Sequence, residues 1–293
     1  MSIQSLVDNP IALDSHSRFA AIIGSHPSKG ARSPKLWNAA FAAHGIDCTM
    51  IPLDVSPGNL VPLLRQLEKD RRFIGGAIAL PYKGLVASYL DTRIDPIAEP
   101  IGAVNCLFRS DNGEISGTNT DGEGALVSFV SRFGEIGDRR VVLIGPGGAG
   151  KAVAAYFSSA TTNKNGFTIV GRNSSELSFA ESLGVRYSDI KSITRHLDDA
   201  EIFINCTSVG GTTSPTESIL SDDDVNRLPP NVIVFDIIYD PRPTLLLKRA
   251  QLRGLSTIDG LDMNLQQAVL AFSRAVSGTV ESSSVYTAMS QVG

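Results

Sequence analysis

The sequence predicts a two-domain α/β protein, with an N-terminal α/β domain followed by a doubly wound, parallel-sheet domain. Three observations predict it: a length of 293 residues, two successive blocks of alternating apolar strands and helical segments, and a glycine-rich turn in the second block. A chain of this length is typical of two domains and can bury a sizeable core. Alternation of strands and helices is typical of parallel sheets. We expect one domain over residues 1–120 together with 260–293, and the other over 121–259.

The first block opens with three apolar runs that predict strands at residues 19–24, 49–53 and 74–80. Amphipathic segments at 34–43 and 60–69 lie between them and predict helices. Proline at position 81 is expected to end the third strand, because proline has no N–H group to donate.

A predicted hairpin closes the first block: residues 106–109 and 114–117 flank the sequence Asp-Asn-Gly, which favours a tight turn. In the second block we expect strands at the four apolar runs 141–144, 167–170, 202–205 and 232–236. A last long helix, residues 261–276, is expected to return to the first domain.

The amino-acid composition indicates which classes of protein and of partner are expected. Hydrophobic residues make up 42% and charged residues 19%, which is typical of an ordinary globular chain. The net charge of −4 provides no basic field, so we expect no nucleic-acid and no membrane partner. The three cysteines have no metal or redox spacing, so we expect no metal site and a reducing, cytoplasmic location. The apolar runs are too short to span a membrane, and no signal-peptide pattern is seen at the N-terminus.

The glycine-rich turn Gly145-Pro146-Gly147-Gly148-Ala149-Gly150 follows a buried strand and precedes a helix that opens at Lys151. In this context its backbone N–H groups and the positive end of the helix dipole can hold a diphosphate. The second domain is therefore predicted to be a Rossmann-type nucleotide-binding domain.

The next strand indicates which nucleotide. An NAD-binding unit usually ends this strand with an acidic residue that accepts from the adenosine 2′-hydroxyl. Here the strand is followed by Gly171 and Arg172, and the first carboxylate is that of Glu176. An arginine can pair with the 2′-phosphate of NADP, so NADP is favoured over NAD. The alternative is that Arg172 is an exposed loop residue.

Two charged residues are candidates for proton transfer. Lys83 follows the end of a strand, where open α/β sheets place their ligands, and Asp121 lies at the expected domain junction. A lysine and an aspartate in one cleft can form a proton-transfer pair. From spacing alone, they can equally be a solvent-facing lysine and a helix-capping aspartate.

These motifs together resemble the shikimate/quinate dehydrogenase family over nearly the whole chain. Several motifs in the family's order are far more specific than the glycine turn alone. They are Ser33-Pro34, Pro81-Tyr82-Lys83, Ile101-Gly102-Ala103-Val104-Asn105, Gly117-Thr118-Asn119-Thr120-Asp121-Gly122, the glycine turn, Asn205-Cys206-Thr207-Ser208, Asp236-Ile237-Ile238-Tyr239, and Asp259-Gly260-Leu261-Asp262-Met263 with Gln267.

The resemblance implies reversible hydride transfer between NADP(H) or NAD(H) and a ring hydroxyl or ketone of a cyclic hydroxy acid, usually shikimate and 3-dehydroshikimate. It implies that Lys83 gives the proton to the carbonyl oxygen while Asp121 binds a ring hydroxyl and holds the lysine. The substrate-binding residues it implies are Ser33, Asn105, Tyr239 and Gln267. The cofactor-binding residues it implies are Gly145, Gly147, Gly148, Ala149, Arg172, Asn173, Asn205, Thr207, Ser208 and Met263. Three simpler roles stay open: Tyr239 bracing a domain interface, Gln267 packing a helix, and Asp236 being structural.

The chain departs from the family's pattern where the substrate carboxylate is expected. Ala31, Ala77 and Ala79 stand where the family usually has a serine, an asparagine and a threonine. Two lost hydrogen bonds to a carboxylate, at about 1.5–3 kcal/mol each, weaken binding by roughly 10²- to 10⁴-fold. Arg32 or Lys29 can replace them with a charge pair, or the substrate is larger or more apolar there.

Asp262, where the family usually has a glycine near the nicotinamide, is a further departure of unassigned role. Two functions are therefore compatible with the sequence. One is an NADP-dependent dehydrogenase with a shifted substrate, acting as a monomer or a homodimer on a small cyclic hydroxy acid. The other is a ligand-sensing protein that kept the fold and lost turnover. The first is favoured because the lysine and the aspartate persist.

Overall fold

The structure is a computed structural model that describes residues 2–13 and 17–292. Its contacts divide the chain into two compact units, one running to Thr120 and resuming at Leu265, the other covering Asp121–Asn264. We call them the first and the second unit. Two helices cross the division: α4 (Thr120–Phe133) and α9 (Gly260–Ala275). The domain bounds at residues 121 and 260 stay a prediction.

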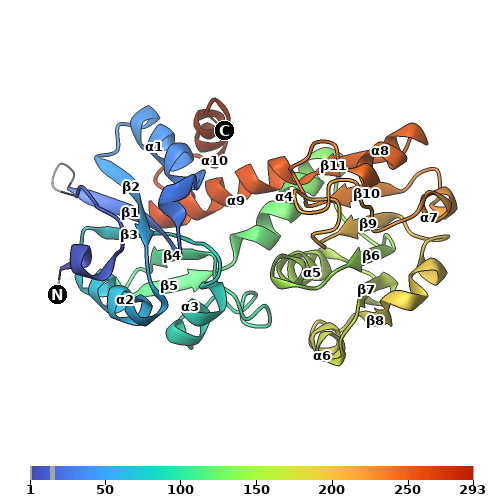
Figure 1. The fold of residues 1–293 in the computed structure, drawn as a ribbon, viewed down its shortest axis with the longest axis horizontal. Helices are drawn as coiled ribbons and strands as arrows, with labels where there is room; N and C mark the ends of the chain where they lie inside the picture. The colour runs from blue at the N-terminus through green and yellow to red at the C-terminus, as the bar shows by residue number, and fades with distance from the viewer. Residues whose placement is uncertain (1, 14–16, 293) are drawn as a thin grey trace. The chain divides into compact units, whose positions relative to one another are not determined.

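The first unit is built on a five-stranded sheet in the order β2-β1-β3-β4-β5 (Figure 1). β1 is parallel to β2 and β3, whereas the β4–β5 hairpin is antiparallel, with Gly113 at φ +81° in its turn. The strands are β1 (Arg18–Gly24), β2 (Cys48–Asp54), β3 (Phe73–Ile78), β4 (Cys106–Arg109) and β5 (Ile115–Thr118). The helices of this unit are α1 (Ser33–Ala43), α2 (Leu60–Lys69), α3 (Lys83–Leu90), α10 (Ser282–Ser290) and the later part of α9.

Helices cover both faces of this sheet because β1 is apolar on both sides. Alternate residues of β1 pack in two different core clusters, Phe19 against α2 and Ala20 against α1 and α9. The Trp37 ring of α1 meets the Phe272 ring of α9 with centroids 5.3 Å apart. The expected return of the long C-terminal helix to the first domain is therefore confirmed.

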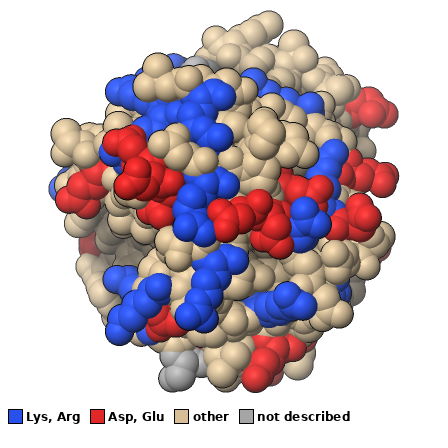
Figure 2. All heavy atoms as spheres, turned by 90° about the vertical axis from the view of Figure 1, so that its right-hand side faces the viewer, with Lys and Arg blue, Asp and Glu red and all other residues tan. Residues whose placement is uncertain are grey.

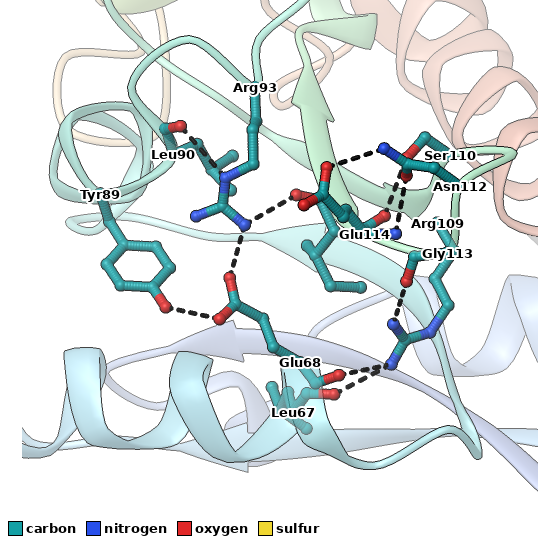
Figure 3. Close-up of polar contacts among 11 residues, drawn as sticks. Leu67, Glu68, Tyr89, Leu90, Arg93, Arg109, Ser110, Asn112, Gly113 and Glu114 are labelled. Carbon is teal, nitrogen blue, oxygen red and sulfur yellow. Dashed lines mark hydrogen bonds and ion pairs between the residues drawn. The ribbon is translucent and has the colours of Figure 1, made fainter.

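Two arginines fasten the hairpin to the rest of the first unit (Figure 3). The Arg109 guanidinium at the end of β4 donates only to main-chain carbonyls, which belong to Leu67, Glu68, Asp70, Phe73 and Gly113. Arg93 donates to the Glu68 carboxylate over 2.6 Å and to the carbonyl of Ile115 over 3.2 Å, while the Tyr89 hydroxyl donates to the same carboxylate.

The second unit has a six-stranded, fully parallel sheet in the order β11-β10-β9-β6-β7-β8. This is the doubly wound Rossmann order, which reverses between β6 and β9 and leaves a crevice there at the carboxyl ends of the strands. The strands are β6 (Val141–Ile144), β7 (Phe167–Gly171), β8 (Arg186–Asp189), β9 (Ile202–Asn205), β10 (Ile233–Asp236) and β11 (Ser256–Asp259). The helices, besides α4 and the start of α9, are α5 (Gly148–Ala160), α6 (Ser174–Ser182), α7 (Asp222–Arg227) and α8 (Leu245–Leu252).

Most expected elements are present, and the differences have local causes. The predicted strand over 74–80 ends at Ile78, and residues 79–82 turn into α3, since Pro81 cannot donate to a ladder. The edge strands β8 and β11 were not expected, because their sequences, Arg-Tyr-Ser-Asp and Ser-Thr-Ile-Asp, contain no apolar run.

Basic and acidic side chains are interspersed on the face that Figure 2 shows. The second unit carries several ion pairs, such as Arg227–Asp198 at 2.6 Å and Arg242–Asp259 at 2.7 Å. Among the described residues, no helix is both long and apolar enough to cross a membrane.

Candidate active site

The glycine-rich turn after β6 keeps the backbone close to its neighbours and leaves space outside it. Gly145 has φ +85°, and a Cβ atom there would come within 2.5 Å of the Thr207 side chain. Gly150 lies against the carbonyl oxygen of Gly145, which lets α5 start close to β6. Around Gly147 and Gly148, by contrast, a Cβ atom would meet nothing within 4 Å. A diphosphate can therefore reach the N–H groups at the start of α5.

This turn borders a pocket of about 450 Å³ that lies entirely within the second unit, at the carboxyl ends of β6, β7 and β9. That volume is within the range of small-molecule sites. The pocket brings together five of the residues expected to bind the cofactor: Gly145, Gly147, Arg172, Thr207 and Ser208. Its remaining lining residues are Ile144, Pro146, Val170, Gly171, Glu176, Ile190, Cys206, Val209 and Ile219.

Glu176 is a pocket residue that was not expected among the site residues. Its Oε2 accepts from the backbone N–H of Arg172 over 2.5 Å and from that of Asn173 over 2.9 Å. Asn173 is the N-cap of α6, so the two side chains form a capping box. The spacing of an Asn three residues before a Glu is the sequence signal for this arrangement.

Buried polar side chains fix the loop after β9 by hydrogen bonds. Oδ1 of Asn205 accepts from the N–H of Thr207 over 3.0 Å and from its hydroxyl over 2.7 Å. The Asn205 amide donates to Asp236, whose other carboxylate oxygen accepts from the Thr244 hydroxyl over 2.7 Å. Asn205 is fully buried, so it acts on the pocket by positioning Thr207.

Asp236 has a structural role in this network. Burial raises the pKa of its carboxyl to about 6, although hydrogen bonds from Thr244, the Ile238 N–H group and Asn205 lower it. Neither Asp236 nor Thr244 lines the nucleotide pocket.

Three further expected residues lie elsewhere in the second unit. Ala149 stands in the first turn of α5, beside Gly148. Tyr239 follows β10 and is 41% exposed. Met263 is buried in the first turn of α9, where it packs in the same apolar cluster as Ile258.

In the first unit, Lys83 is the first residue of α3, directly after the turn that leaves β3. The preceding Tyr82 is buried and donates from its hydroxyl to the carbonyl of Val55 over 2.5 Å. The Lys83 carbonyl accepts from the N–H of Val104 over 3.0 Å. These bonds hold the start of α3 against neighbouring loops, with Lys83 just beyond the carboxyl end of β3.

Ser33 begins α1, after a loop that Asp54 holds in place. The Asp54 carboxylate accepts from the N–H of Ser28 over 2.8 Å and from its hydroxyl over 2.5 Å. Gly30 follows at φ +116°, so the loop turns sharply before Arg32 and Ser33. Ser28 and Asp54 were not predicted, because they are far apart in the sequence and no motif joins them.

Asn105 directly precedes β4 and is hydrogen-bonded to the start of α4. Its Oδ1 accepts from the N–H of Thr120 over 2.7 Å, and its Nδ2 lies 3.1 Å from the Thr120 hydroxyl. Asn119 donates to the carbonyl of Ala103 over 2.9 Å. These bonds fix the residue that precedes Asp121, which stands in the first turn of α4.

The positions where the chain departs from the family's pattern are apolar contacts in the structure. Ala31, Ala77 and Ala79 are half-buried and pack against the cluster formed by α1, α9 and α10. Gln267 is half-buried on α9, next to the buried Ala268. Within residues 2–13 and 17–292, no group of three or more His, Cys, Asp or Glu side chains could hold a metal ion.

Comparisons with known proteins agree with this architecture. Residues 22–107 match the family described as shikimate dehydrogenase substrate binding domain, and residues 129–259 match the family described as shikimate / quinate 5-dehydrogenase. Shikimate dehydrogenase (NADP(+)) of Alkaliphilus oremlandii is 32% identical over 266 residues, which cover 87% of this chain and 90% of the relative.

Solved structures are similar over most of the chain. Shikimate 5-dehydrogenase from Listeria monocytogenes, in complex with shikimate and NAD, has a TM-score of 0.81 and 27% identity, covering 94% of this chain and 98% of that one. The ligand-free form of 5-ketofructose reductase of Gluconobacter sp. strain CHM43 has a TM-score of 0.78 and 26% identity, covering 94% of this chain and 99% of that one. The matched domains, the extent of the match and the nucleotide pocket lead to one conclusion: this chain belongs to the shikimate dehydrogenase family.

Proposed function

We propose that this protein is an NADP-dependent oxidoreductase that acts on a CH–OH group, interconverting shikimate and 3-dehydroshikimate or a related cyclic hydroxy acid. The nucleotide pocket carries the proposal: its open glycine turn suits a diphosphate, and Arg172 suits a 2′-phosphate. The similarity to a relative named as NADP(+)-dependent supports it, as does the Listeria structure that holds shikimate.

Each expected site residue then has a chemical task. When bound, the nicotinamide would accept or supply the hydride. Lys83 would give a proton to the carbonyl oxygen in the direction of reduction and take it back in the direction of oxidation. Asp121 would accept a hydrogen bond from a ring hydroxyl and keep the lysine charged.

The remaining residues would bind and orient the two ligands. Ser33, Arg32 and Tyr239 would bind the substrate carboxylate, and Asn105 and Gln267 its hydroxyls. The cofactor would be held by Gly145, Gly147, Gly148, Ala149, Arg172, Asn173, Thr207, Ser208 and Met263, and Asn205 would contribute by positioning Thr207. The three buried, free cysteines fit a reducing, cytoplasmic location, and we propose a monomer or a homodimer.

A second candidate function is the reduction of an uncharged polyol ketone. Methyl groups stand at Ala31, Ala77 and Ala79, where the resemblance implies polar contacts to a carboxylate. The similarity to a 5-ketofructose reductase shows that this fold is also found in an enzyme whose named substrate has no carboxylate. Loss of two carboxylate contacts would weaken shikimate binding by roughly 10²- to 10⁴-fold, whereas a ketone without a carboxylate would lose nothing.

Initial rates of NADP⁺ reduction with shikimate, quinate and amino-substituted shikimate, and of NADPH oxidation with 5-ketofructose, test both functions. Efficient shikimate turnover supports the first function and means that Arg32 or a neighbour replaces the missing contacts. A better rate with 5-ketofructose supports the second. Absence of turnover on every substrate, with NADP⁺ still bound, would contradict both and favour a ligand-sensing protein.

A further inference from the structure

The nucleotide pocket holds two residues of opposite charge at the point where β7 ends. Arg172 is exposed and directly follows the strand, while Glu176 is half-buried in the first turn of α6. Both line the same pocket. An arginine at this point favours a 2′-phosphate, whereas a carboxylate repels one and can accept from a 2′-hydroxyl.

The Glu176 carboxylate is fixed in place by its hydrogen bonds. Its Oε2 accepts from the N–H groups of Arg172 and Asn173 and lies 3.5 Å from the Tyr187 hydroxyl. It also lies against the α-carbon of Gly171, where a Cβ atom would collide with it. These contacts oppose movement of the side chain away from an approaching phosphate.

The same bonds remove the backbone donors that a phosphate would use. The N–H groups at the beginning of a helix are a ready-made anion site. Directly before α6, the N–H groups of Arg172 and of the N-cap residue Asn173 already donate to a carboxylate, which supplies its own negative charge. A 2′-phosphate would therefore find Arg172 as an attractive partner and Glu176 as a fixed repulsive one.

We propose that Glu176 is a specificity-determining residue that limits how strongly the pocket prefers NADP⁺, so that NAD⁺ binds more weakly than NADP⁺ by no more than about tenfold. This inference rests on the proposed function, because it concerns the same nucleotide site. Its physical basis is the capping box: the carboxylate that stabilises α6 stands where the 2′-substituent of the adenosine arrives.

A charge series at this position tests the inference by binding rather than by turnover. Calorimetry on the full chain, without substrate, would give the dissociation constants of NADP⁺ and NAD⁺ for the wild type, Glu176→Gln and Glu176→Lys. Glutamine keeps a capping oxygen, so α6 is retained. We expect the two constants to be within about tenfold of each other in the wild type. The preference for NADP⁺ should rise by roughly tenfold in Glu176→Gln and further in Glu176→Lys.

Asp224→Asn is the matched control, because Asp224 forms the capping box of α7 with Ser221 and does not line the pocket. It should leave the ratio of the two constants unchanged. An unchanged or lower preference for NADP⁺ in both Glu176 variants would overturn the inference while leaving the proposed function intact. If neither nucleotide binds the wild type, the proposed function fails and the inference fails with it.

Discussion

The side-chain amide of Asn205 donates to Oδ1 of the buried Asp236 carboxylate over 3.0 Å. The same asparagine accepts two hydrogen bonds from Thr207, which lines the nucleotide pocket. A continuous chain of bonds therefore runs from the core of the second unit to the wall of the site. Asn205 and Asp236 therefore affect the nucleotide pocket through this series of hydrogen bonds and not by contact with a ligand.

Thr207→Val should weaken NADP⁺ binding by about tenfold, because it removes the 2.7 Å bond to Asn205 and leaves a buried acceptor short of a partner. Thr207→Ser is the matched control, since it keeps the hydroxyl and should bind almost as tightly as the wild type. Titration calorimetry measures both. Equal loss in the two variants would contradict a specific role for the hydroxyl, because serine keeps it and valine does not.

Asp236 should make stability depend on pH in a direction opposite to that of most carboxylates. Burial raises its pKa to about 6 from 3.8, so the folded protein keeps a proton that the unfolded chain has lost between about pH 4 and 6. The contribution of this group to the free energy of unfolding therefore falls as pH rises through that window, by about 2–3 kcal/mol, and is constant above it.

Urea unfolding of the wild type and of Asp236→Asn at pH 4, 5, 6 and 7 measures this contribution. The variant cannot titrate there, so the difference in unfolding free energy, wild type minus variant, should decrease from pH 4 to pH 7 by that amount. Other carboxylates cancel in the difference. A difference that stays constant with pH would contradict the raised pKa.

Two glycines of the same turn should respond differently to substitution by alanine. Gly147→Ala places a methyl group in open space, so stability should change by less than about 0.5 kcal/mol while nucleotide binding falls at least tenfold. Gly150→Ala forces the start of α5 away from the Gly145 carbonyl and should lower the free energy of unfolding by about 2–3 kcal/mol. Thermal unfolding and calorimetry distinguish the two, and similar stability losses would show that the space outside Gly147 is closed.

Lys83→Met should lower kcat by about 10²- to 10⁴-fold on whichever substrate is found, since it removes the proposed proton donor and keeps the length of the side chain. The dissociation constant of NADP⁺ should be unchanged, because the nucleotide pocket is formed by the second unit alone. Lys69→Met, at an exposed position at the end of α2, is the control. Near-normal kcat in the Lys83 variant would rule out its catalytic role.

Arg109→Ala should destabilise the first unit by about 3 kcal/mol, because five main-chain carbonyls would each lose the guanidinium as a donor at once. Figure 3 shows the guanidinium between α2 and the hairpin. Arg71→Ala removes a single 3.4 Å contact to Gly113 at the surface and should cost less than about 0.5 kcal/mol. Chemical unfolding of both variants measures the two values. Equal values would mean that water replaces the Arg109 side chain at no cost.

Sequence patterns predicted those parts of the fold that depend on local periodicity. The bounds of α2, β6 and β9 agree with the residues expected for them, because each is a short segment whose apolar spacing is unambiguous. The polar edge strands β8 and β11 were missed, because an edge strand is held by hydrogen bonds to one neighbour and needs no apolar run.

By itself, the sequence determined the α/β class, the glycine turn and the position of Arg172 directly after a predicted strand. These features follow from residue type and from spacing within a few positions. Only the tertiary structure decided that Asn205 reaches Asp236, that Asp54 holds the loop before Ser33, and that Glu176 lines the nucleotide pocket. The first two are contacts between residues 31 and 26 positions apart in the chain, and parallel strands bring such residues together. Local sequence patterns do not predict which distant side chains come into contact, because the packing of the whole sheet decides those contacts.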